Sequence, residues 1–389
     1  MDSGFRANPY PSYAGLRRNQ PVVQVDPGGF WAVSRYDDVV HVLRHPRLFT
    51  SHGFQVAWEP AWLGYSPMAH SMLALDGEAH RRLRTLATRV FNGTAVRRLE
   101  SRIRALAAQL ADGLAAQGEA DFISAFAMPL PTTVIGGLMG LEASLHGRFK
   151  GWADDLASIT PEPLNAAHAT RVRTTVEEMT RYLTEVLNAR RREPAEDLVT
   201  DLVRAEVQGQ PLTDREIIGF LVLVMVAGLE TTVHLLGNAL LFLAEHPDAL
   251  ARLRAEPMLI PRFIEELLRY ESPVQCVLRF TTAETKLAGV TIPRDAVVMA
   301  VIGAANRDER RYFEPERFEL HRELPSLAFG HGAHHCIGAM LARMEAQRGL
   351  EALLSRFQGF TRLSREVPWN LSFAVRGPAS LPLRFIPAG

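Results

Sequence analysis

The sequence predicts a mainly α fold with a minor β part. Segments with apolar residues at helical spacing occupy most of the chain from Asp76 onward. Short strand-like segments occur near residue 30 and between residues 277 and 292. Apolar residues make up 47% of the chain, which is ample for a large core. These three observations favour one compact, largely helical unit.

The N-terminal part, roughly residues 1–75, is expected to be β-rich. Turn-forming residues at 26–29 precede the strand-like segment Phe30–Ser34. Residues 51–75 carry several aromatic side chains among Gly and Pro, without a regular period. A long aromatic segment of this kind is typical of a functional lid, so we predict a loop there.

Roughly residues 76–389 are expected to form a helical body. A very long helix is predicted from Asp214 to His246, with Thr213 or Asp214 as its cap and Pro247 after its end. Because this helix is apolar almost all round, its first half must be buried. Other helices are predicted over 77–92, 94–117, 123–140, 144–158, 166–192, 195–207, 263–270 and 337–357, and short strands around 277–280, 286–287 and 291–292.

Length and composition restrict the class of protein. A chain of 389 residues exceeds the usual size of a single core, yet no linker, composition shift or repeat divides it. We therefore predict a single domain over residues 1–389. The 43 basic and 43 acidic residues give zero net charge, which argues against a nucleic-acid binder that relies on bulk charge.

Two further features predict a soluble, cytoplasmic protein. Two cysteines, Cys276 and Cys336, cannot form a disulfide framework, and the first residues lack the apolar segment of a secretory signal. The uncharged run Ile217–Leu229 is shorter than the roughly 20 residues that a membrane-spanning helix needs. We expect no membrane association.

The strongest chemical feature is Cys336, in a glycine-rich segment that leads into a helix. Backbone N–H groups and the helix dipole favour a thiolate there, and thiolate on iron favours O–O cleavage. Two alternatives are a buried structural cysteine and a zinc site. The possible zinc ligands are clustered within six positions and lack the separated pairs of a usual zinc site: His331, His334, His335 and Cys336. This segment alone leaves all three interpretations open.

Residues 329–338 resemble the haem-binding signature of the cytochrome P450 superfamily, Phe-x-x-Gly-x-(His/Arg)-x-Cys-x-Gly, and every fixed position matches. Further motifs of the superfamily occur in the expected order, so the resemblance covers essentially the whole chain. It implies a triangular helical prism with small β-sheets, in which haem b lies between the long central helix and the cysteine loop. Cys336 would be the axial ligand to iron, and the other expected haem contacts are Ala227, Phe329, Gly330 and Gly338.

A second motif is Glu266-x-x-Arg269, whose side chains share one helix face. Taken alone, it is an ordinary surface ion pair. Arg317, in the segment 313–318, would add a second guanidinium, and one carboxylate between two guanidiniums makes a plausible buried clamp. The resemblance implies that these three residues fix the loop that presents Cys336.

The third motif, Ala227–Thr232, places an acid and a hydroxyl inside the long apolar helix. Such groups are costly there unless they have a partner or a function. Gly228 weakens the helix and would leave room for a ligand. Alone, the motif could be a polar kink or a helix–helix hydrogen bond. The resemblance implies that Thr231 helps to hold dioxygen and an ordered water, while Glu230 relays protons.

The fourth motif places His80 and Arg84 four residues apart, on one helix face. Each alone could be a solvated charge. Haem carries two propionates, which need cationic or hydrogen-bonding partners when they are buried. The resemblance implies that the partners are His80, Arg84, Arg279 and His334.

The resemblance also implies a substrate pocket with a mostly apolar lining, which suits an apolar or amphipathic organic substrate. For each aromatic side chain, core packing is an equal alternative. The expected lining residues are Phe54, Trp58, Trp62, Val224, Ala227, Val274, Val277 and Phe373.

We therefore expect a soluble, bacterial-type haem-thiolate monooxygenase that hydroxylates or epoxidises a small organic molecule in secondary metabolism. The substrate would arrive free or bound to a carrier protein, and the enzyme would be a monomer. Because no reductase domain is appended, electrons would come from a separate ferredoxin and ferredoxin reductase. Alternatives are peroxide-driven oxygenation or oxidative coupling and, from another class, a non-catalytic helical protein with a zinc or structural cysteine. A basic docking face for ferredoxin could be formed by Arg89, Arg97, Arg98, Arg102, Arg343 and Arg348.

Overall fold

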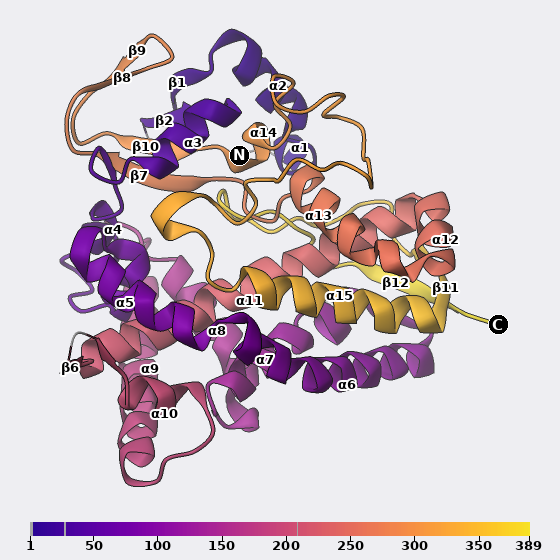
Figure 1. Cartoon of the computed structure of the whole chain (residues 1–389), viewed down its shortest axis with the longest axis horizontal. Helices are drawn as coiled ribbons and strands as arrows, with labels where there is room; N and C mark the ends of the chain where they lie inside the picture. Colours follow the sequence, from indigo (N-terminus) through magenta and orange to yellow (C-terminus); the bar gives the residue numbers. More distant parts are fainter. Residues whose placement is uncertain (1–2, 27–28, 208) are drawn as a thin grey trace. The chain divides into compact units, whose positions relative to one another are not determined.

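The computed structural model describes residues 3–26, 29–207 and 209–389, so Pro27 and Gly28 of the predicted turn lie outside the described residues. The chain forms two compact units that alternate along the sequence. Figure 1 labels the helices and strands and colours the chain by residue number. The first unit comprises Met1–Phe49, Val96–Pro131 and Glu230–Gly389. The second comprises Thr50–Ala95 and Thr132–Leu229. That residues 1–389 act as one domain stays a prediction.

The first unit contains a five-stranded sheet in the order β1-β2-β10-β7-β3. β2 pairs with β1 and β7 pairs with β10 in antiparallel fashion, whereas β2 and β10 are parallel. A buried apolar cluster on this sheet includes Val33 of β2, Val298 of β10 and Ile302. It also includes Leu327, which lies just before the loop that carries Cys336. The strands are β1 (Val22–Val25), β2 (Phe30–Val33), β3 (Phe49–Thr50), β7 (Val277–Thr281) and β10 (Val297–Ala300).

The prediction of a β-rich segment over residues 1–75 is only partly right. Three helices that the sequence analysis did not predict lie there: α1 (Ser3–Ala7), α2 (Tyr10–Asn19) and α3 (Tyr36–Arg44). α3 buries Val39, Val42 and Leu43. These positions are spaced at i, i+3 and i+4, so the side chains lie on one helix face. The pattern is too short to be recognised in a stretch of sequence long enough to identify a helix.

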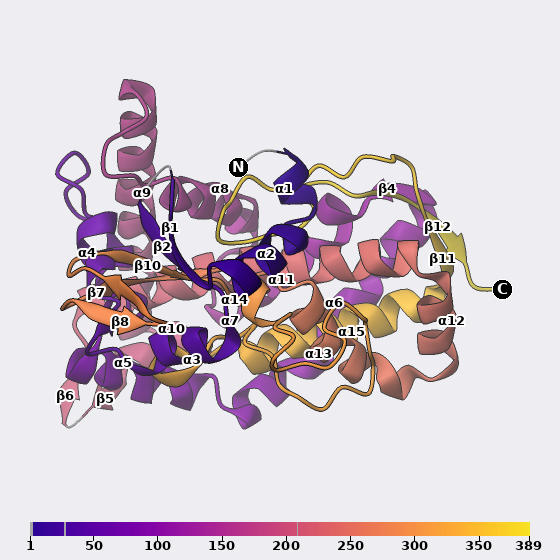
Figure 2. The same cartoon turned by 90° about the horizontal axis from the view of Figure 1, so that it is seen from above.

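The remaining elements of the first unit are helices, a hairpin and a second sheet. α13 and α15 lie side by side (Figure 2), and both were predicted to within three residues at each end. β11, β12 and β4 form a three-stranded sheet. The elements are α6 (Gly93–Gln117), β4 (Glu119–Asp121), a π-helix (Ile123–Ala127), α12 (Pro247–Ala255), α13 (Ile260–Tyr270), β8 (Thr285–Leu287), β9 (Val290–Ile292), α14 (Ile302–Ala305), α15 (Ala339–Arg356), β11 (Phe357–Arg362) and β12 (Pro382–Pro387).

The second unit is almost entirely helical. The predicted loop over 51–75 contains short helices, and the predicted helix over 195–207 is shorter because Asp197 caps its start at 2.8 Å from the Thr200 amide. A hairpin, β5 and β6, then follows. The elements are α4 (Gly53–Trp58), η1 (Pro67–His70), η2 (Met72–Ala74), α5 (Gly77–Val90), α7 (Pro129–Leu138), η4 (Ala143–Leu145), α8 (His146–Ala157), α9 (Ala166–Arg192), α10 (Leu198–Val203), β5 (Glu206–Val207) and β6 (Gln210–Pro211).

The long helix α11 (Asp214–Glu245) matches its prediction. Thr213 and Glu216 form a capping box, because the Glu216 carboxylate accepts from the Thr213 amide at 2.8 Å and the Thr213 hydroxyl accepts from the Glu216 amide at 3.3 Å. The helix ends before Pro247. By length and composition alone it could cross a membrane, but 72% of its apolar stretch is buried inside the protein.

Candidate active site

Residues 329–338, which form the cysteine loop before α15, are held in one shape by their own backbone. The Cys336 amide donates to the Phe329 carbonyl oxygen at 2.9 Å, which closes the loop at its base. Gly330 and Gly332 have φ angles of 72° and 73°, in the left-handed region that favours glycine. A Cβ on Gly332 would also lie 2.7 Å from the backbone oxygen of Leu43 in α3. The two glycines therefore permit both the turn and its close approach to α3.

The two cysteines differ sharply in environment. Cys336 is exposed, whereas Cys276 is buried, and burial raises the pKa of the Cys276 thiol to about 12. Cys336 lies two residues before Gly338, the N-cap of α15, where the helix dipole favours a thiolate. A Cβ on Gly338 would contact the Cys336 Sγ at an ordinary 3.9 Å. Cys336 is thus the cysteine placed to bind a metal, and crowding at its sulfur does not explain Gly338.

Side chains from other elements hold the start of this loop. The Leu327 amide donates to the Asn306 side-chain oxygen at 2.7 Å, and Asn306 in turn donates to the Ser272 hydroxyl at 2.7 Å. In addition, the Arg343 guanidinium of α15 lies 4.3 Å from the centroid of the Phe329 ring. The N-terminal end of the loop is therefore tied to buried Asn306 and to α15.

Glu266 and Arg269 form the predicted ion pair, and both are almost fully buried. Two guanidinium nitrogens of Arg269 donate to the two carboxylate oxygens at 2.7 and 2.8 Å. A third nitrogen, Nη1, donates to the backbone oxygens of Asn306 and Pro315 at 3.0 and 2.9 Å. The pair thus joins α13 to the irregular segment that leads to the cysteine loop.

The prediction that Arg317 supplies the second guanidinium is wrong. Its side chain is exposed and pairs with Glu314 at 3.3 Å, and only its backbone oxygen contacts Arg269, at 3.1 Å. The second guanidinium belongs to Arg322, whose Nε lies 3.3 Å from Glu266 Oε1. Because the segment is irregular, no periodicity in the sequence distinguishes these two arginines.

Glu230 and Thr231 lie in the middle of α11, and both are half-buried. Ala227, one turn earlier, is exposed although most of the surrounding helix is buried. The expected role of Gly228 in leaving room for a ligand stays a prediction. A Cβ there would lie 3.0 Å from the Ile135 side chain, so the glycine also admits Ile135 of α7 close to the helix.

Two partners of Glu230 were not predicted from the sequence. His234 lies one turn further along α11, with its Nε2 atom 3.6 Å from Glu230 Oε1. The side-chain nitrogen of Asn370 donates to the same oxygen at 3.5 Å. The spacing of Glu230 and His234 could have suggested the first contact, whereas Asn370 is 140 residues away in sequence.

The four predicted propionate partners are divided between the units. His80 is 3% exposed and Arg84 is half-buried, and both lie on α5 in the second unit. Arg279 is 5% exposed on β7 of the first unit and donates to the Leu278 backbone oxygen at 2.7 Å. His334 ends a short 3₁₀ helix inside the cysteine loop. His80 and Arg84 thus lie on a helix that was predicted, and Arg279 lies on a strand that was predicted.

Three predicted pocket residues of the second unit are aromatic. Phe54 and Trp58 stack on each other in α4, with ring centroids 4.6 Å apart. Trp62 has a structural contact, because its indole N–H donates to the Thr160 backbone oxygen at 2.9 Å. Val224 on α11 is buried. Trp62 is thus tied to the backbone, while Phe54 and Trp58 remain half-exposed.

The other predicted pocket residues lie in the first unit. Val274 and Val277 are half-buried beside β7, and Val274 forms an isolated β-bridge with Val375. Phe373 is 41% exposed and stacks on Phe30, with ring centroids 6.2 Å apart. The stacking places Phe373 beside Phe30 of β2, the second strand of the five-stranded sheet.

The arrangement of the described side chains does not support a zinc site. Across residues 3–26, 29–207 and 209–389, no group of three or more His, Cys, Asp or Glu side chains is arranged to hold a metal ion.

Comparison with known proteins identifies the family to which the chain belongs. Residues 153–370 match the family described as Cytochrome P450. Cytochrome P450 107B1 of Saccharopolyspora erythraea is 38% identical over 398 residues, covering 99% of this chain and 96% of the relative. The chain belongs to the cytochrome P450 family. This P450 is therefore a monooxygenase whose cofactor is haem with a thiolate ligand.

Other comparisons agree over nearly the full length of the P450. Cyclomarin C epoxidase CymV of Salinispora arenicola is 36% identical, covering 95% of this chain and 94% of the relative. The structure of CYP109Q5 from Chondromyces apiculatus has a TM-score of 0.91 and 39% identity, covering 100% and 97%. The structure of P450BioI with a hexadec-9Z-enoic acid-ligated acyl carrier protein has a TM-score of 0.90 and 30% identity, covering 99% and 100%. The predicted P450 fold is confirmed.

The residues of the cysteine loop fit this cofactor. The exposed Cys336 is presented by a backbone-locked loop, at the N-terminal end of α15. The other cysteine is buried with a raised thiol pKa, which disfavours the thiolate that haem requires.

Proposed function

We propose that this P450 hydroxylates or epoxidises an apolar or amphipathic organic molecule in secondary metabolism. The exposed thiol of Cys336 on its locked loop carries this proposal, together with the acid–alcohol pair of α11. Similarity to an enzyme named cyclomarin C epoxidase supports epoxidation as one outcome. Similarity to P450BioI, crystallised with an acyl carrier protein, supports a carrier-bound substrate as one option.

Cys336 would ligate the haem iron, and Phe329, Gly330, Gly338 and Ala227 would contact the macrocycle. Bound haem supplies the thiolate-ligated iron at which dioxygen is reduced. The two propionates would be neutralised by His80, Arg84, Arg279 and His334. Because buried carboxylates need such partners, these four side chains would also fix the orientation of the cofactor.

Glu230 and Thr231 would manage protons and water. The reaction consumes one dioxygen, two electrons and two protons, and it gives one oxygen atom to the substrate and the other to water. The Thr231 hydroxyl can donate and accept hydrogen bonds, so it would hold an ordered water. The Glu230 carboxylate would take protons from solvent and pass them on, a role that its 40% exposed side chain permits.

The electrons would come from a separate ferredoxin and ferredoxin reductase, and the enzyme would act as a cytoplasmic monomer. Two arginines of the expected ferredoxin-docking face already have acidic partners. Arg348 pairs with Glu100 and Glu351, and Arg343 pairs with Glu265. Docking would therefore rely less on these two arginines than on the rest of the expected face.

The haem ligand is tested with a matched pair of cysteine variants. Reduced wild-type protein under carbon monoxide should show the strongly red-shifted absorption of thiolate-ligated haem. Cys336→Ser should lose this band, and Cys276→Ala should keep it. Loss of the band in Cys276→Ala, with retention in Cys336→Ser, would overturn the assignment.

Thr231→Ala tests the dioxygen route. We expect the variant to consume reductant but to release peroxide, so that product formed per reductant falls about tenfold or more. The measurement is product and peroxide per reductant, with a substrate chosen from a screen for substrate-induced spectral shifts. Unchanged coupling would defeat the role of Thr231 and favour peroxide-driven oxygenation.

A further inference from the structure

We infer that His234 and Asn370 are positioning residues that hold the Glu230 carboxylate in place for proton relay. This inference rests on the proposed function of Glu230. Because about 40% of the Glu230 side chain is exposed, the surrounding core does not enclose it. A group that relays protons works only in a defined position, so its partners matter.

One face of α11 is polar over two turns. Glu230, His234 and Asn238 are four residues apart and therefore lie on the same face of the helix. All three meet the segment 370–377. Asn370 donates to Glu230 at 3.5 Å, and the Asn238 side-chain nitrogen donates to the Arg376 backbone oxygen at 3.3 Å. This polar face of α11 thus packs against the segment 370–377 and is not a set of unrelated polar residues.

His234 is locked between Glu230 and Gly377. It is 5% exposed, and a Cβ on Gly377 would lie 2.5 Å from its Cβ and Cγ atoms, which is too close for any side chain at position 377. In the part of the chain that the structure describes, neither ring nitrogen has a hydrogen-bond partner, and Glu230 lies 3.6 Å from Nε2. A buried imidazole without a partner is costly. Glu230 is therefore the acceptor toward which Nε2 can donate.

Asn370 is held from the other side. Its backbone amide donates to the Gly377 oxygen at 3.1 Å, and its side-chain nitrogen also donates to the Val375 oxygen at 3.0 Å. The side-chain oxygen of Asn370 accepts from the Gly377 amide at 3.3 Å. These contacts orient the amide so that its remaining N–H points toward the Glu230 carboxylate.

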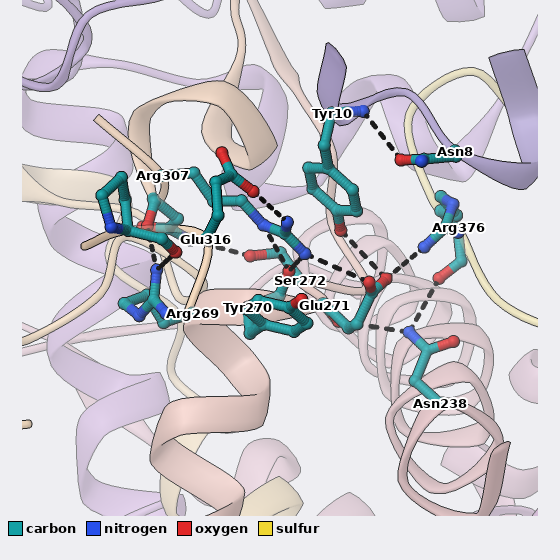
Figure 3. A network of polar contacts seen from close by, with 12 residues as sticks. Asn8, Tyr10, Asn238, Arg269, Tyr270, Glu271, Ser272, Arg307, Glu316 and Arg376 are labelled. Carbon is teal, nitrogen blue, oxygen red and sulfur yellow. Dashed lines mark hydrogen bonds and ion pairs between the residues drawn. The ribbon is translucent and has the colours of Figure 1, made fainter. Parts of the chain in front are cut away.

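The base of this segment is anchored by the network of Figure 3. Arg376 forms an ion pair with Glu271, and its Nε donates to the Arg6 backbone oxygen at 2.9 Å. Glu271 also accepts from the Tyr10 hydroxyl at 3.0 Å and from Arg307 at 3.2 Å. The network therefore anchors the segment at Arg376, next to Gly377, against which His234 packs.

The contact itself can be observed without turnover. In protein labelled with ¹⁵N-histidine and held as the reduced carbon monoxide complex, we expect Glu230→Gln to shift the ring-nitrogen signals of His234. Loss of the signals in His234→Gln assigns them. The matched control is His246, just beyond the end of the same helix, whose Nδ1 faces the Phe242 oxygen at 2.9 Å and whose signals should not move. Unshifted His234 signals would overturn the inference.

The second measurement is the rate of peroxide release during turnover. It is made without added substrate, with a plant-type ferredoxin and its reductase as electron donors. His234→Phe should lower the rate about tenfold and raise the solvent deuterium isotope effect, because proton delivery becomes limiting. His234→Gln should restore most of the rate, Asn370→Ala should lower it less, and His246→Gln should leave it unchanged.

The two proposals fail in different ways. If Glu230→Gln leaves the rate and the isotope effect unchanged, the proposed role of Glu230 is wrong. If Glu230→Gln slows the reaction but His234→Phe does not, Glu230 keeps its role and the positioning inference is wrong. If the inference is right, adding His234→Phe to Glu230→Gln should cause little further loss.

Discussion

Two buried carboxylates lie on neighbouring helices beside the cysteine loop and meet opposite environments. Glu266 of α13 is 4% exposed, and Glu345 of α15 is 1% exposed. Glu266 accepts hydrogen bonds from the guanidiniums of Arg269 and Arg322 and from the Glu319 amide at 2.8 Å. It is therefore a charged anchor whose negative charge is compensated.

Glu345 has no such support. Within the described residues, its Oε1 atom has no hydrogen-bond partner, and burial raises the pKa of its carboxyl to about 8. Glu345 thus keeps its proton near neutral pH. The comparison teaches that burial alone leaves an acid neutral, whereas guanidinium partners let a carboxylate serve as a charged tie.

Removing the compensating charge should have the largest effect. Arg269→Ala leaves Glu266 buried with only one guanidinium nearby and frees the backbone oxygens of Asn306 and Pro315. We expect a loss of about 3–5 kcal/mol in the free energy of unfolding. The measurement is urea unfolding together with the haem absorption band of the purified protein.

A double variant sharpens this result. Replacing both Glu266 and Arg269 by Ala removes the unpaired charge, so the combined loss should be smaller than the sum of the single losses. Additive losses would show that the two side chains act independently and would contradict the clamp.

Glu345 should make the free energy of unfolding depend on pH. Its carboxyl pKa is about 8 in the folded protein against an ordinary value of 4.5, so the folded state binds the extra proton. The resulting stabilisation is complete below pH 4.5, falls as pH rises from there to about 8, and is then lost. Near pH 7 the loss is about 3 kcal/mol.

Glu345→Gln removes this titration. The melting temperature of the variant relative to wild type should therefore rise between pH 5 and pH 8, and then level off. A difference that stays constant over this range would mean that Glu345 is ionised in the folded protein.

Much of the fold could be predicted because long amphipathic and apolar segments dominate it. α9 was predicted residue for residue, and α11 was predicted within one residue of its end. The short helices α2 and α3 and the C-terminal strands β11 and β12 were missed. Their stability comes from packing against distant segments, which local periodicity does not record.

The site shows the same limit. Cys336 and the pair Glu266–Arg269 could be predicted because their motifs are local in sequence. Arg322 and Asn370 could not, since both reach their carboxylates from irregular segments 56 and 140 residues away. Irregular backbone has no period, so the direction of a side chain there follows only from tertiary structure.

Arg322 and Arg317 give the smallest and most direct test of the comparison. Arg322 is 10% exposed and contacts buried Glu266, whereas Arg317 is 66% exposed and pairs with a half-exposed Glu314. Arg322→Ala should cost about 1–3 kcal/mol in the free energy of unfolding. Arg317→Ala should cost roughly 0–1 kcal/mol, because solvent screens an exposed pair. Both values come from urea unfolding of the haem-loaded proteins. A larger loss in Arg317→Ala than in Arg322→Ala would mean that Arg317 supplies the second guanidinium. Only a buried contact with a charged group would make an arginine side chain stabilise the fold by that amount.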